Sequence, residues 1–303
     1  MKITGIPCCY YTTTVMLLDD DEKYLNILQD SVPSPHKIFT KVADALAFLA
    51  EAPLTAFHSN AADSDTHLAS LKAQLERPER SEEISVLIVD YQMPGMNGLD
   101  FCKKVRSPHF KIIMLTGEAT LALAVNAFNE GTIDRFIQKS TPHLHRELEH
   151  TIAEMQFKHF QDASAFWINS LSKQGTPLPW FLQNDVFCDF FTQIMQRHQI
   201  SEYAVLNAEG DFMIRHADGR QAYLTVRDAA HLDALIKLEA EPAYWDEPSP
   251  EAKAIYESIQ KKEQIPFLHT QEKYLDLVEW PLFPLQTETV GGQVFYYALT
   301  NVA

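Results

Sequence analysis

The chain has 303 residues, of which 46% are apolar, and its formal net charge is −16 at pH 7. This length predicts one large domain or two ordinary ones, and the apolar content is sufficient for packed cores. The acidic balance argues against a broad contact with DNA or RNA phosphates, which depends on Lys and Arg. No apolar run reaches about 18 residues, so we expect no membrane span, and the N-terminus lacks the apolar core of a secretory signal.

Four cysteines are present, Cys8, Cys9, Cys102 and Cys188. The side chains of adjacent cysteines diverge in an extended chain, and no two cysteines have the spacing of a metal-binding or redox pair. The sequence therefore predicts a cytoplasmic protein with reduced thiols.

Residues 1–11 are predicted to be a loose leader, after which strands and helices alternate five times. The expected strands are 12–18, 36–42, 86–90, 111–115 and 133–138, and the expected helices between them are 22–29, 43–51, 99–105 and 120–129. This alternation predicts an α/β fold, a parallel sheet with helices on both faces. A polar segment, residues 53–83, interrupts the pattern as an insert, and a helix is expected in it from His67 to Arg77.

Polar residues follow four of these strands at their C-terminal ends. Asp19 and Asp20 follow the first strand, Asp90 ends the third, Thr116 follows the fourth and Lys139 follows the fifth. Alone, Asp90 could simply begin a turn, as Asp often does. In an open α/β sheet, however, ligands bind at the carboxyl ends of the strands. Four strand ends with polar residues therefore predict one shared site.

The chemistry of these residues suits phosphoryl transfer. The simpler explanation of the acids after the first strand is that they begin a helix, whose dipole stabilises negative charge; this would account for one or two exposed carboxylates. Converging carboxylates repel one another unless a cation neutralises them, and oxygen-only ligands suit Mg²⁺, the usual metal of phosphoryl transfer. A carboxylate can accept a phosphoryl group as an acyl phosphate, whose oxygens a Lys and a Thr can bind. The sequence predicts an aspartyl-phosphate site.

Residues 12–142 resemble the receiver domain of a two-component response regulator. The motifs that carry the resemblance are Leu-Leu-Asp-Asp-Asp, Val-Asp-Tyr-Gln-Met-Pro-Gly-Met-Asn-Gly, Met-Leu-Thr-Gly and Arg-Phe-Ile-Gln-Lys. The resemblance implies a flavodoxin-like (βα)5 fold with a parallel sheet in the order 2-1-3-4-5. It also implies a sensor histidine kinase or phosphotransfer protein as the partner that donates the phosphoryl group, and a receiver that catalyses its own phosphorylation and dephosphorylation.

The resemblance assigns a role to each candidate residue. Asp90 is the phosphoacceptor, and Asp19, Asp20, Asp90 and the backbone carbonyl of Gln92 hold Mg²⁺. The remaining roles belong to Thr116 as the switch hydroxyl, Lys139 as the phosphate-binding cation, Phe136 as the switch aromatic and Gly117 as the small residue next to the phosphate. Phosphorylation is then expected to change the face made by the fourth helix and the fifth strand.

Two features depart from the family pattern. Ser140 stands where the family usually has Pro after the Lys, which puts the rigidity of that loop in question. The insert 53–83 adds a surface, and His58, Asp65 and His67 within it fit no metal-binding pattern, so we expect them to be surface residues. Similar inserts and motifs, Val-Asp-Tyr-x-Met-Pro-Gly-Met and Leu-Thr-Gly-Glu-Ala, make the chain resemble the regulators of quorum-sensing circuits of the Legionella type.

Residues 143–174 are predicted to form one extended helix. Leu144, Leu148, Ile152 and Met155 recur every three or four residues, which is typical of a helix with one apolar face. Such a helix can form a signalling coiled coil between two protomers, so we expect a homodimer. The alternative is that this face packs within the chain, on the next domain.

Residues 175–303 are expected to form an α+β output domain with an antiparallel sheet. The expected elements, after a linker at 175–179, are helices 180–198, 227–239 and 250–262 and strands 203–207, 212–215, 221–226, 274–281 and 293–300. The motifs Val-Leu-Asn-Ala-Glu-Gly-Asp and Trp-Pro-Leu-Phe loosely resemble a PAS domain. A set of aromatics can line a ligand pocket or simply form core: Tyr223, Phe283, Phe295 and Tyr296.

The output domain contains no dedicated enzyme motif. Residues 175–303 carry nine Lys or Arg and nineteen Asp or Glu, a net charge of −10, which argues against a DNA reader. We therefore expect an output that binds a downstream protein or a small ligand. A receiver-controlled enzyme or nucleotide-binding domain is the alternative, and a DNA-binding output ranks third.

Overall fold

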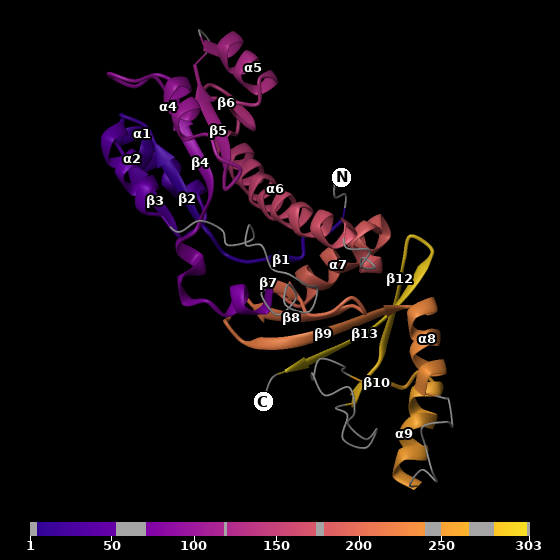
Figure 1. Cartoon of the computed structure of the whole chain (residues 1–303). Helices are drawn as coiled ribbons and strands as arrows, with labels where there is room; N and C mark the ends of the chain where they lie inside the picture. Colours follow the sequence, from indigo (N-terminus) through magenta and orange to yellow (C-terminus); the bar gives the residue numbers. More distant parts are fainter. Residues whose placement is uncertain are drawn as a thin grey trace. The chain divides into compact units, whose positions relative to one another are not determined.

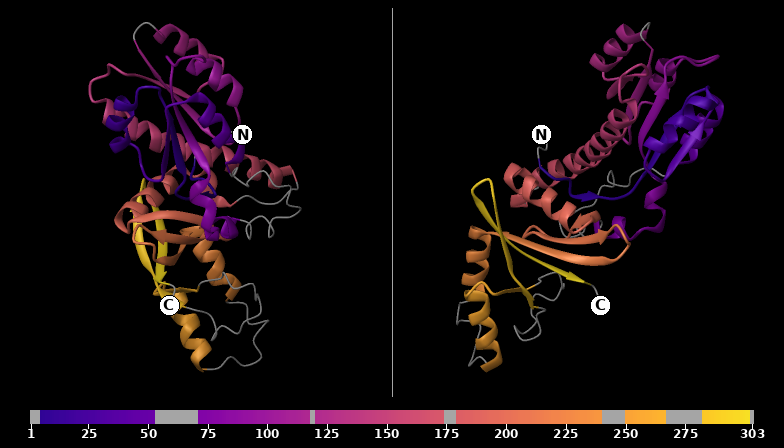
Figure 2. Two further views of the ribbon diagram at one scale, coloured as in Figure 1. Left: turned by 90° about the vertical axis from the view of Figure 1, so that its left-hand side faces the viewer. Right: turned by 180° about the vertical axis from the view of Figure 1, so that it is seen from behind.

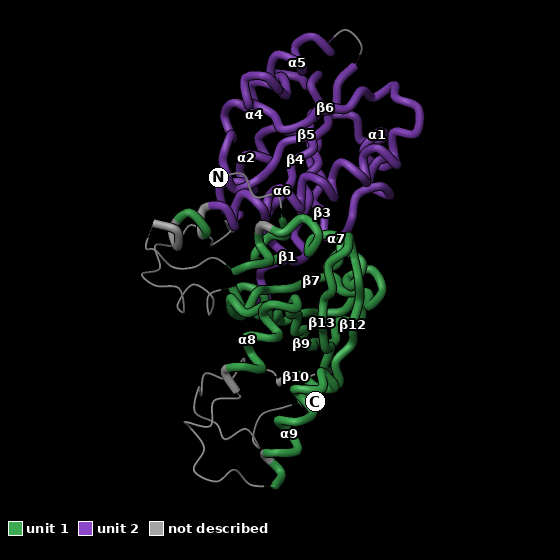
Figure 3. Tube along the Cα trace, turned by 90° about the vertical axis from the view of Figure 1, so that its right-hand side faces the viewer, with its two compact units in different colours: residues 1–10, 61–76, 168–303 green, residues 11–60, 77–167 purple. Residues whose placement is uncertain are grey.

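A computed structural model of the chain describes residues 5–52, 71–117, 120–173, 179–239, 250–266 and 282–301. The chain divides into two compact units, and each is described by itself (Figure 3). One unit comprises residues 11–60 and 77–167, and the other comprises residues 1–10, 61–76 and 168–303. No helix of the described part of the chain combines the length and the apolar character needed to cross a membrane.

The first unit is built on a five-stranded parallel sheet (Figure 1). Its strands, in spatial order, are β3 (His36–Phe39), β2 (Thr14–Leu18), β4 (Ile84–Asp90), β5 (Lys111–Thr116) and β6 (Arg135–Gln138). This is the predicted order 2-1-3-4-5, so the expected flavodoxin-like fold is confirmed.

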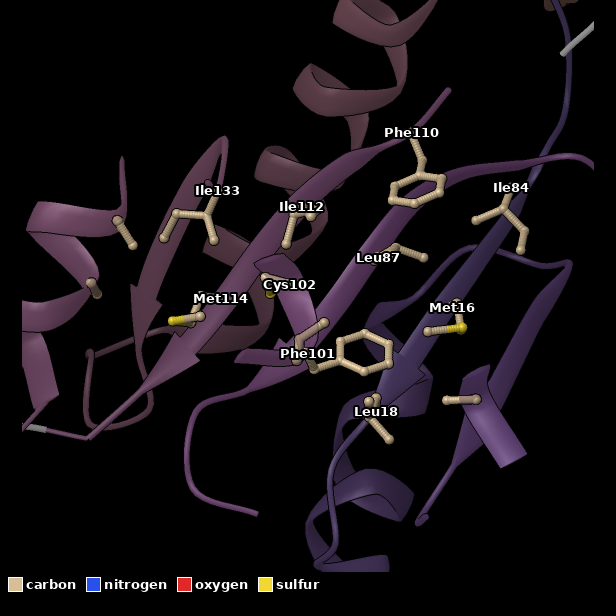
Figure 4. Packing of buried hydrophobic residues seen from close by; sticks show 14 residues of the cluster. Met16, Leu18, Ile84, Leu87, Phe101, Cys102, Phe110, Ile112, Met114 and Ile133 are labelled. Atoms are coloured by element: carbon tan, nitrogen blue, oxygen red, sulfur yellow. The ribbon is translucent and has the colours of Figure 1, made fainter. Parts of the chain in front are cut away.

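Helices cover both faces of this sheet, and each face has its own apolar core. One core joins the sheet to α2 (Val42–Glu51), α4 (Gly98–Val105) and α5 (Leu121–Asn129), and includes Met16, Leu87, Phe101, Ile112 and Met114 (Figure 4). The other joins it to α1 (Glu22–Leu28) and α6 (Leu144–Lys173) through Val15, Val86, Ile113 and Leu148. Successive strand residues point to opposite faces, so a sheet buried on both sides needs unbroken apolar strands.

Helix α6 is a single helix of 30 residues, and its unbroken ribbon, labelled in Figure 1, can be followed from two further sides in Figure 2. The predicted seam residues Leu148, Ile152 and Met155 are fully buried in the core of the first unit. The first half of this face therefore packs within the chain against the sheet of the first unit, whereas the alternative placed it on the next domain.

The insert is only partly described. Residues 53–70, including His58, Asp65 and His67, lie outside the described residues. The predicted helix is present over 71–76, where Leu71 and Leu75 are buried, and a 3-10 turn, η3 (Pro78–Glu82), follows it.

The second unit contains a six-stranded sheet whose strand pairs are all antiparallel. The strands, in spatial order, are β1 (Cys9–Tyr10), β7 (Ile200–Val205), β8 (Asp211–His216), β9 (Gln221–Asp228), β13 (Gln293–Asn301) and β12 (Gln286–Val290). The expected antiparallel domain is confirmed. Four strands were not predicted: β1, β12 and the two members of a small second sheet, β10 (Gln264–Pro266) and β11 (Leu282–Pro284). The expected strand 274–281 lies outside the described residues.

The end of the predicted leader is not loose. Cys9 and Tyr10 pair with Ala204 and Tyr203, so they form an edge strand of this sheet. Cys8 and Cys9 are both fully buried. This pairing satisfies backbone groups that β7 would otherwise leave free at the edge of the sheet.

The second core is aromatic. The predicted helix 180–198 is divided into η5 (Trp180–Gln183) and α7 (Asp185–Arg197) by Asn184, whose side chain caps α7 by accepting from the Phe187 N–H at 3.0 Å. Helices α8 (Ala229–Glu239) and α9 (Pro250–Gln260) follow the meander. Phe190 of α7 stacks on Phe295 with 4.6 Å between the ring centroids. Of the aromatics that could have lined a ligand pocket or formed core, Phe295 is a core residue. Phe283 and Tyr296 pack beside a second apolar cluster.

Candidate functional site

Three carboxylates meet at the C-terminal edge of the parallel sheet. Strands β2 and β4 are neighbours, with Leu18 opposite Val89, so Asp19 and Asp90 leave the sheet side by side. Oxygens of Asp19, Asp20 and Asp90 all lie within 4.8 Å of one another. Asp19 and Asp90 are buried, whereas Asp20 is exposed. The cluster therefore has one side open to solvent.

Lys139 joins this cluster from the end of β6. Its Nζ lies 2.7 Å from Asp19 Oδ2 and 2.7 Å from Asp90 Oδ1. Burial raises the pKa of Asp90, and the nearby Lys139 only partly opposes this. Burial lowers the pKa of Lys139, but its two carboxylate partners outweigh this effect and raise it.

The charge balance of the site fits a divalent cation. Three ionised carboxylates and one ammonium leave the site with two negative charges in excess. Ionised carboxylates this close repel one another, and a cation that takes oxygen ligands relieves the repulsion. The donor set of Asp19, Asp20 and Asp90 therefore fits Mg²⁺.

The third acid of the triplet has a different task. The Asp21 side chain accepts from the Lys23 N–H at 2.9 Å and from the Tyr24 N–H at 3.1 Å, which caps α1. The Asp21 N–H in turn donates to Asp19 Oδ1 at 2.9 Å. The helix-terminus interpretation is thus right for Asp21, while Asp19 and Asp20 belong to the carboxylate cluster.

The loop after β4 holds Asp90 through its backbone. The Gln92 N–H donates to Asp90 Oδ2 at 2.8 Å. The Gly98 N–H donates to the Tyr91 carbonyl at 2.8 Å, and a Cβ at position 98 would lie 2.0 Å from the Asp90 carbonyl oxygen. The chain can close over the acid only because residue 98 has no side chain.

We expect Gly98→Ala to destabilise the protein by about 2 kcal/mol, because a methyl group in a packed position forces the backbone to move. Urea unfolding of the full chain followed by circular dichroism measures this change. Gly117→Ala is the matched control, since none of the described residues lies within 4 Å of a Cβ there. Equal urea midpoints for the two variants would show that the short distance between position 98 and the Asp90 carbonyl does not exclude a side chain.

Thr116 ends β5, next to the strand that carries Asp90. Asp90 pairs with Leu115, so Thr116 lies one residue beyond it along the edge. The buried Thr116 hydroxyl bonds to the Thr120 hydroxyl and donates to the Gly117 carbonyl at 3.1 Å. Sequence reasoning missed Thr120, although its spacing of four residues from Thr116 was visible.

The loop after Lys139 is held without the Pro of the family pattern. The Lys139 N–H donates to the Thr116 carbonyl at 2.9 Å, and the Thr141 N–H donates to the Gln138 carbonyl at 3.0 Å. These two backbone bonds fix the turn that contains Ser140. The substitution therefore does not leave Lys139 unanchored.

Phe136 lies on the side of the sheet covered by α5. Its half-buried ring meets the ring of Phe128 edge-on, with 6.3 Å between the centroids. Three apolar residues of α5 are exposed: Leu123, Val125 and Phe128. The face made by α5 and β6 therefore carries apolar surface, which favours contact with another protein.

Residues 59–152 match the family model of the response regulator receiver domain. The chemotaxis protein CheY1 of Helicobacter pylori is 40% identical over 76 residues, which cover 24% of this chain and 61% of that protein. The chemotaxis protein CheY homolog of Campylobacter jejuni is 36% identical over 72 residues, which cover 22% of this chain and 55% of that protein. The chain thus spans about three fifths of the length of the curated relatives it matches.

The structural comparison extends over both units. The structure of the Legionella pneumophila response regulator LqsR aligns with a TM-score of 0.80 and 26% identity, covering 99% of this chain and 91% of that one. The matched family model, the parallel sheet order and the carboxylate cluster at its edge agree with one another. The first unit therefore has the fold of a response regulator receiver domain, and the chain matches that family's model over residues 59–152.

Proposed function

We propose that the protein is a response regulator of a two-component phosphorelay and that Asp90 accepts the phosphoryl group. The observation that carries this proposal is the placement of Lys139, 2.7 Å from both Asp19 and Asp90, beside the exposed Asp20. Such a site combines a nucleophile, a set of metal ligands and a cation for the phosphoryl oxygens. The donor is a sensor histidine kinase or a phosphotransfer protein.

The proposed step is an in-line displacement on phosphorus. An Asp90 carboxylate oxygen forms a bond to phosphorus while the bond from phosphorus to the donor's histidine nitrogen breaks, and the nitrogen keeps the electron pair. Asp19, Asp20, Asp90 and the Gln92 carbonyl would hold Mg²⁺, which supplies charge neutralisation on the phosphoryl oxygens. Lys139 provides the second positive charge, because its ammonium already contacts the Asp90 carboxylate.

Phosphorylation would then change the face made by α5 and β6. The Thr116 hydroxyl leaves Thr120 for a phosphoryl oxygen, a strong acceptor that the unmodified site lacks. Phe136 follows into the space behind Thr116, away from Phe128. The exposed apolar residues of α5 then present a different surface, which is a local charge change read out by a two-state element.

The second unit is proposed to be a protein- or ligand-binding output domain. Its acidic balance supports this, and the likeness to LqsR over the whole chain supports a place among quorum-sensing regulators. A homodimer is part of the proposal. Its interface would have to use positions other than Leu148, Ile152 and Met155, because these are buried within the first unit.

Acetyl phosphate provides the test of this proposal. We expect the full chain to gain one phosphoryl group in mass spectra when Mg²⁺ is present and none when EDTA replaces it. Mg²⁺ at about ten times its Kd should also stabilise the folded protein by about 1.4 kcal/mol. Labelling that is equal with Mg²⁺ and with EDTA would refute the proposed metal-assisted site.

A further inference from the structure

Lys139 has a third neighbour that the proposed chemistry does not use. An ammonium group has three N–H donors, and two of them point to Asp19 and Asp90. The ring of Tyr24 covers the same ammonium, with Nζ 4.3 Å from the ring centroid. This distance is typical of a cation–π interaction. Among the described residues, the Lys139 ammonium thus contacts two carboxylates and one aromatic face.

The position of the Tyr24 ring does not depend on its hydroxyl. The hydroxyl oxygen is buried and has no hydrogen-bond partner among the described residues. The ring packs beside the apolar core of α1 and α6, and the Asp21 cap fixes the Tyr24 backbone. Packing, capping and the ammonium therefore set the ring in place.

The two carboxylates are not permanent partners for Lys139. In the proposed function, Asp19 and Asp90 become metal ligands, and Asp90 also becomes the phosphoryl acceptor. Lys139 must then exchange carboxylate oxygens for phosphoryl oxygens. A Lys ammonium sits on a flexible stem that gains rotamer freedom when its contacts are lost. The ring is the contact that this exchange leaves untouched.

We propose that Tyr24 is a positioning residue for Lys139, and that its ring holds the ammonium in the site while the anionic partners are exchanged. This inference rests on the proposed function. The aromatic ring of Tyr24, and not its hydroxyl, holds the ammonium. The role is one of placement, because Tyr24 itself forms no bond to the reacting atoms.

Labelling of the full chain by acetyl phosphate with Mg²⁺ tests this proposal. We expect Tyr24→Leu to slow labelling about tenfold, the size of a desolvated cation–π contact. Tyr24→Phe keeps the ring and should restore the rate that Tyr24→Leu loses. A rate for Tyr24→Leu equal to that of the wild type would overturn the proposal. So would a loss in Tyr24→Phe as large as in Tyr24→Leu, because the hydroxyl would then carry the effect.

A second pair of variants separates positioning from a general structural effect. In a Lys139→Ala background, Tyr24→Leu should slow labelling no further, because the two residues act through one contact. An additional tenfold loss in that background would refute positioning.

If Tyr24→Leu lowers the unfolding temperature, Tyr24→Met replaces it as an unbranched, ring-free variant. A wild-type chain that is not labelled at all would refute the proposed function, which distinguishes that failure from a failure of the Tyr24 assignment.

Discussion

Asp90→Asn is expected to reduce phosphoryl labelling by acetyl phosphate and Mg²⁺ below detection. The amide is nearly the same shape as the carboxylate, but it lacks the nucleophilic oxygen that forms the acyl phosphate. The matched control is Asp44→Asn, which changes an exposed acid on α2 of the same unit and should be labelled as the wild type. Label that persists in Asp90→Asn would move the acceptor to another residue.

The same variant should be more stable than the wild type in the absence of divalent cations. Burial raises the pKa of Asp90 above the value of about 3.9 expected for an unfolded Asp. The folded state then binds this proton more tightly, so stability falls as pH rises from about 3.9 through the folded-state pKa. At neutral pH, ionised Asp90 therefore costs stability relative to a neutral side chain, and Asn removes this cost. Urea unfolding with EDTA measures the gain, and an equal or lower midpoint for Asp90→Asn would contradict it.

The residues of the site were predictable because a parallel sheet converts sequence position into spatial position. The central strands β2, β4 and β5 are largely apolar and end at or just before a polar residue, and parallel strands place those ends on one edge. Asp19, Asp90 and Lys139 therefore had to meet, although about seventy residues separate the first two along the chain.

Tyr24 was not predictable in the same way. Its spacing from Leu25 and Leu28 indicates a helix face that packs on the core, and the ring does pack there. Its contact with Lys139 depends on a side-chain direction that the periodicity does not specify. An aromatic residue one turn after a strand-end acid was the available signal, and it is a weak one.

The second unit was less predictable because antiparallel pairing depends on register and on turn geometry. Strand β12 has a polar sequence, and its two-residue turn, Gly291-Gly292, has positive φ at both positions, which suits a tight hairpin. Strand β1 pairs with a segment almost two hundred residues away. Neither local composition nor periodicity encodes such a partner.

The buried ion pair between Asp211 and Arg227 is the largest stability effect that we expect in the second unit. Asp211 is fully buried and Arg227 is 2% exposed, and Arg227 Nη1 lies 2.9 Å from Asp211 Oδ1. The Asn207 side chain donates to the other oxygen at 2.7 Å, and the Thr225 hydroxyl also bonds to the carboxylate. Asp211→Ala removes the counter-charge but leaves the guanidinium buried. We expect a loss of about 3–5 kcal/mol.

Guanidinium unfolding followed by tryptophan fluorescence measures this loss, because the Trp180 indole donates to the carbonyl of Glu209, two residues before Asp211. Asp218→Ala is the matched control: it breaks an Asp–Arg pair in the adjoining turn whose side chains are 53% and 64% exposed, and exposed pairs contribute little. Adding Arg227→Met to Asp211→Leu should recover most of the lost stability, because a buried pair replaced by apolar residues leaves no unpaired charge. If the double variant were as unstable as Asp211→Ala, the packing of these side chains, rather than the uncompensated charge, would account for the loss.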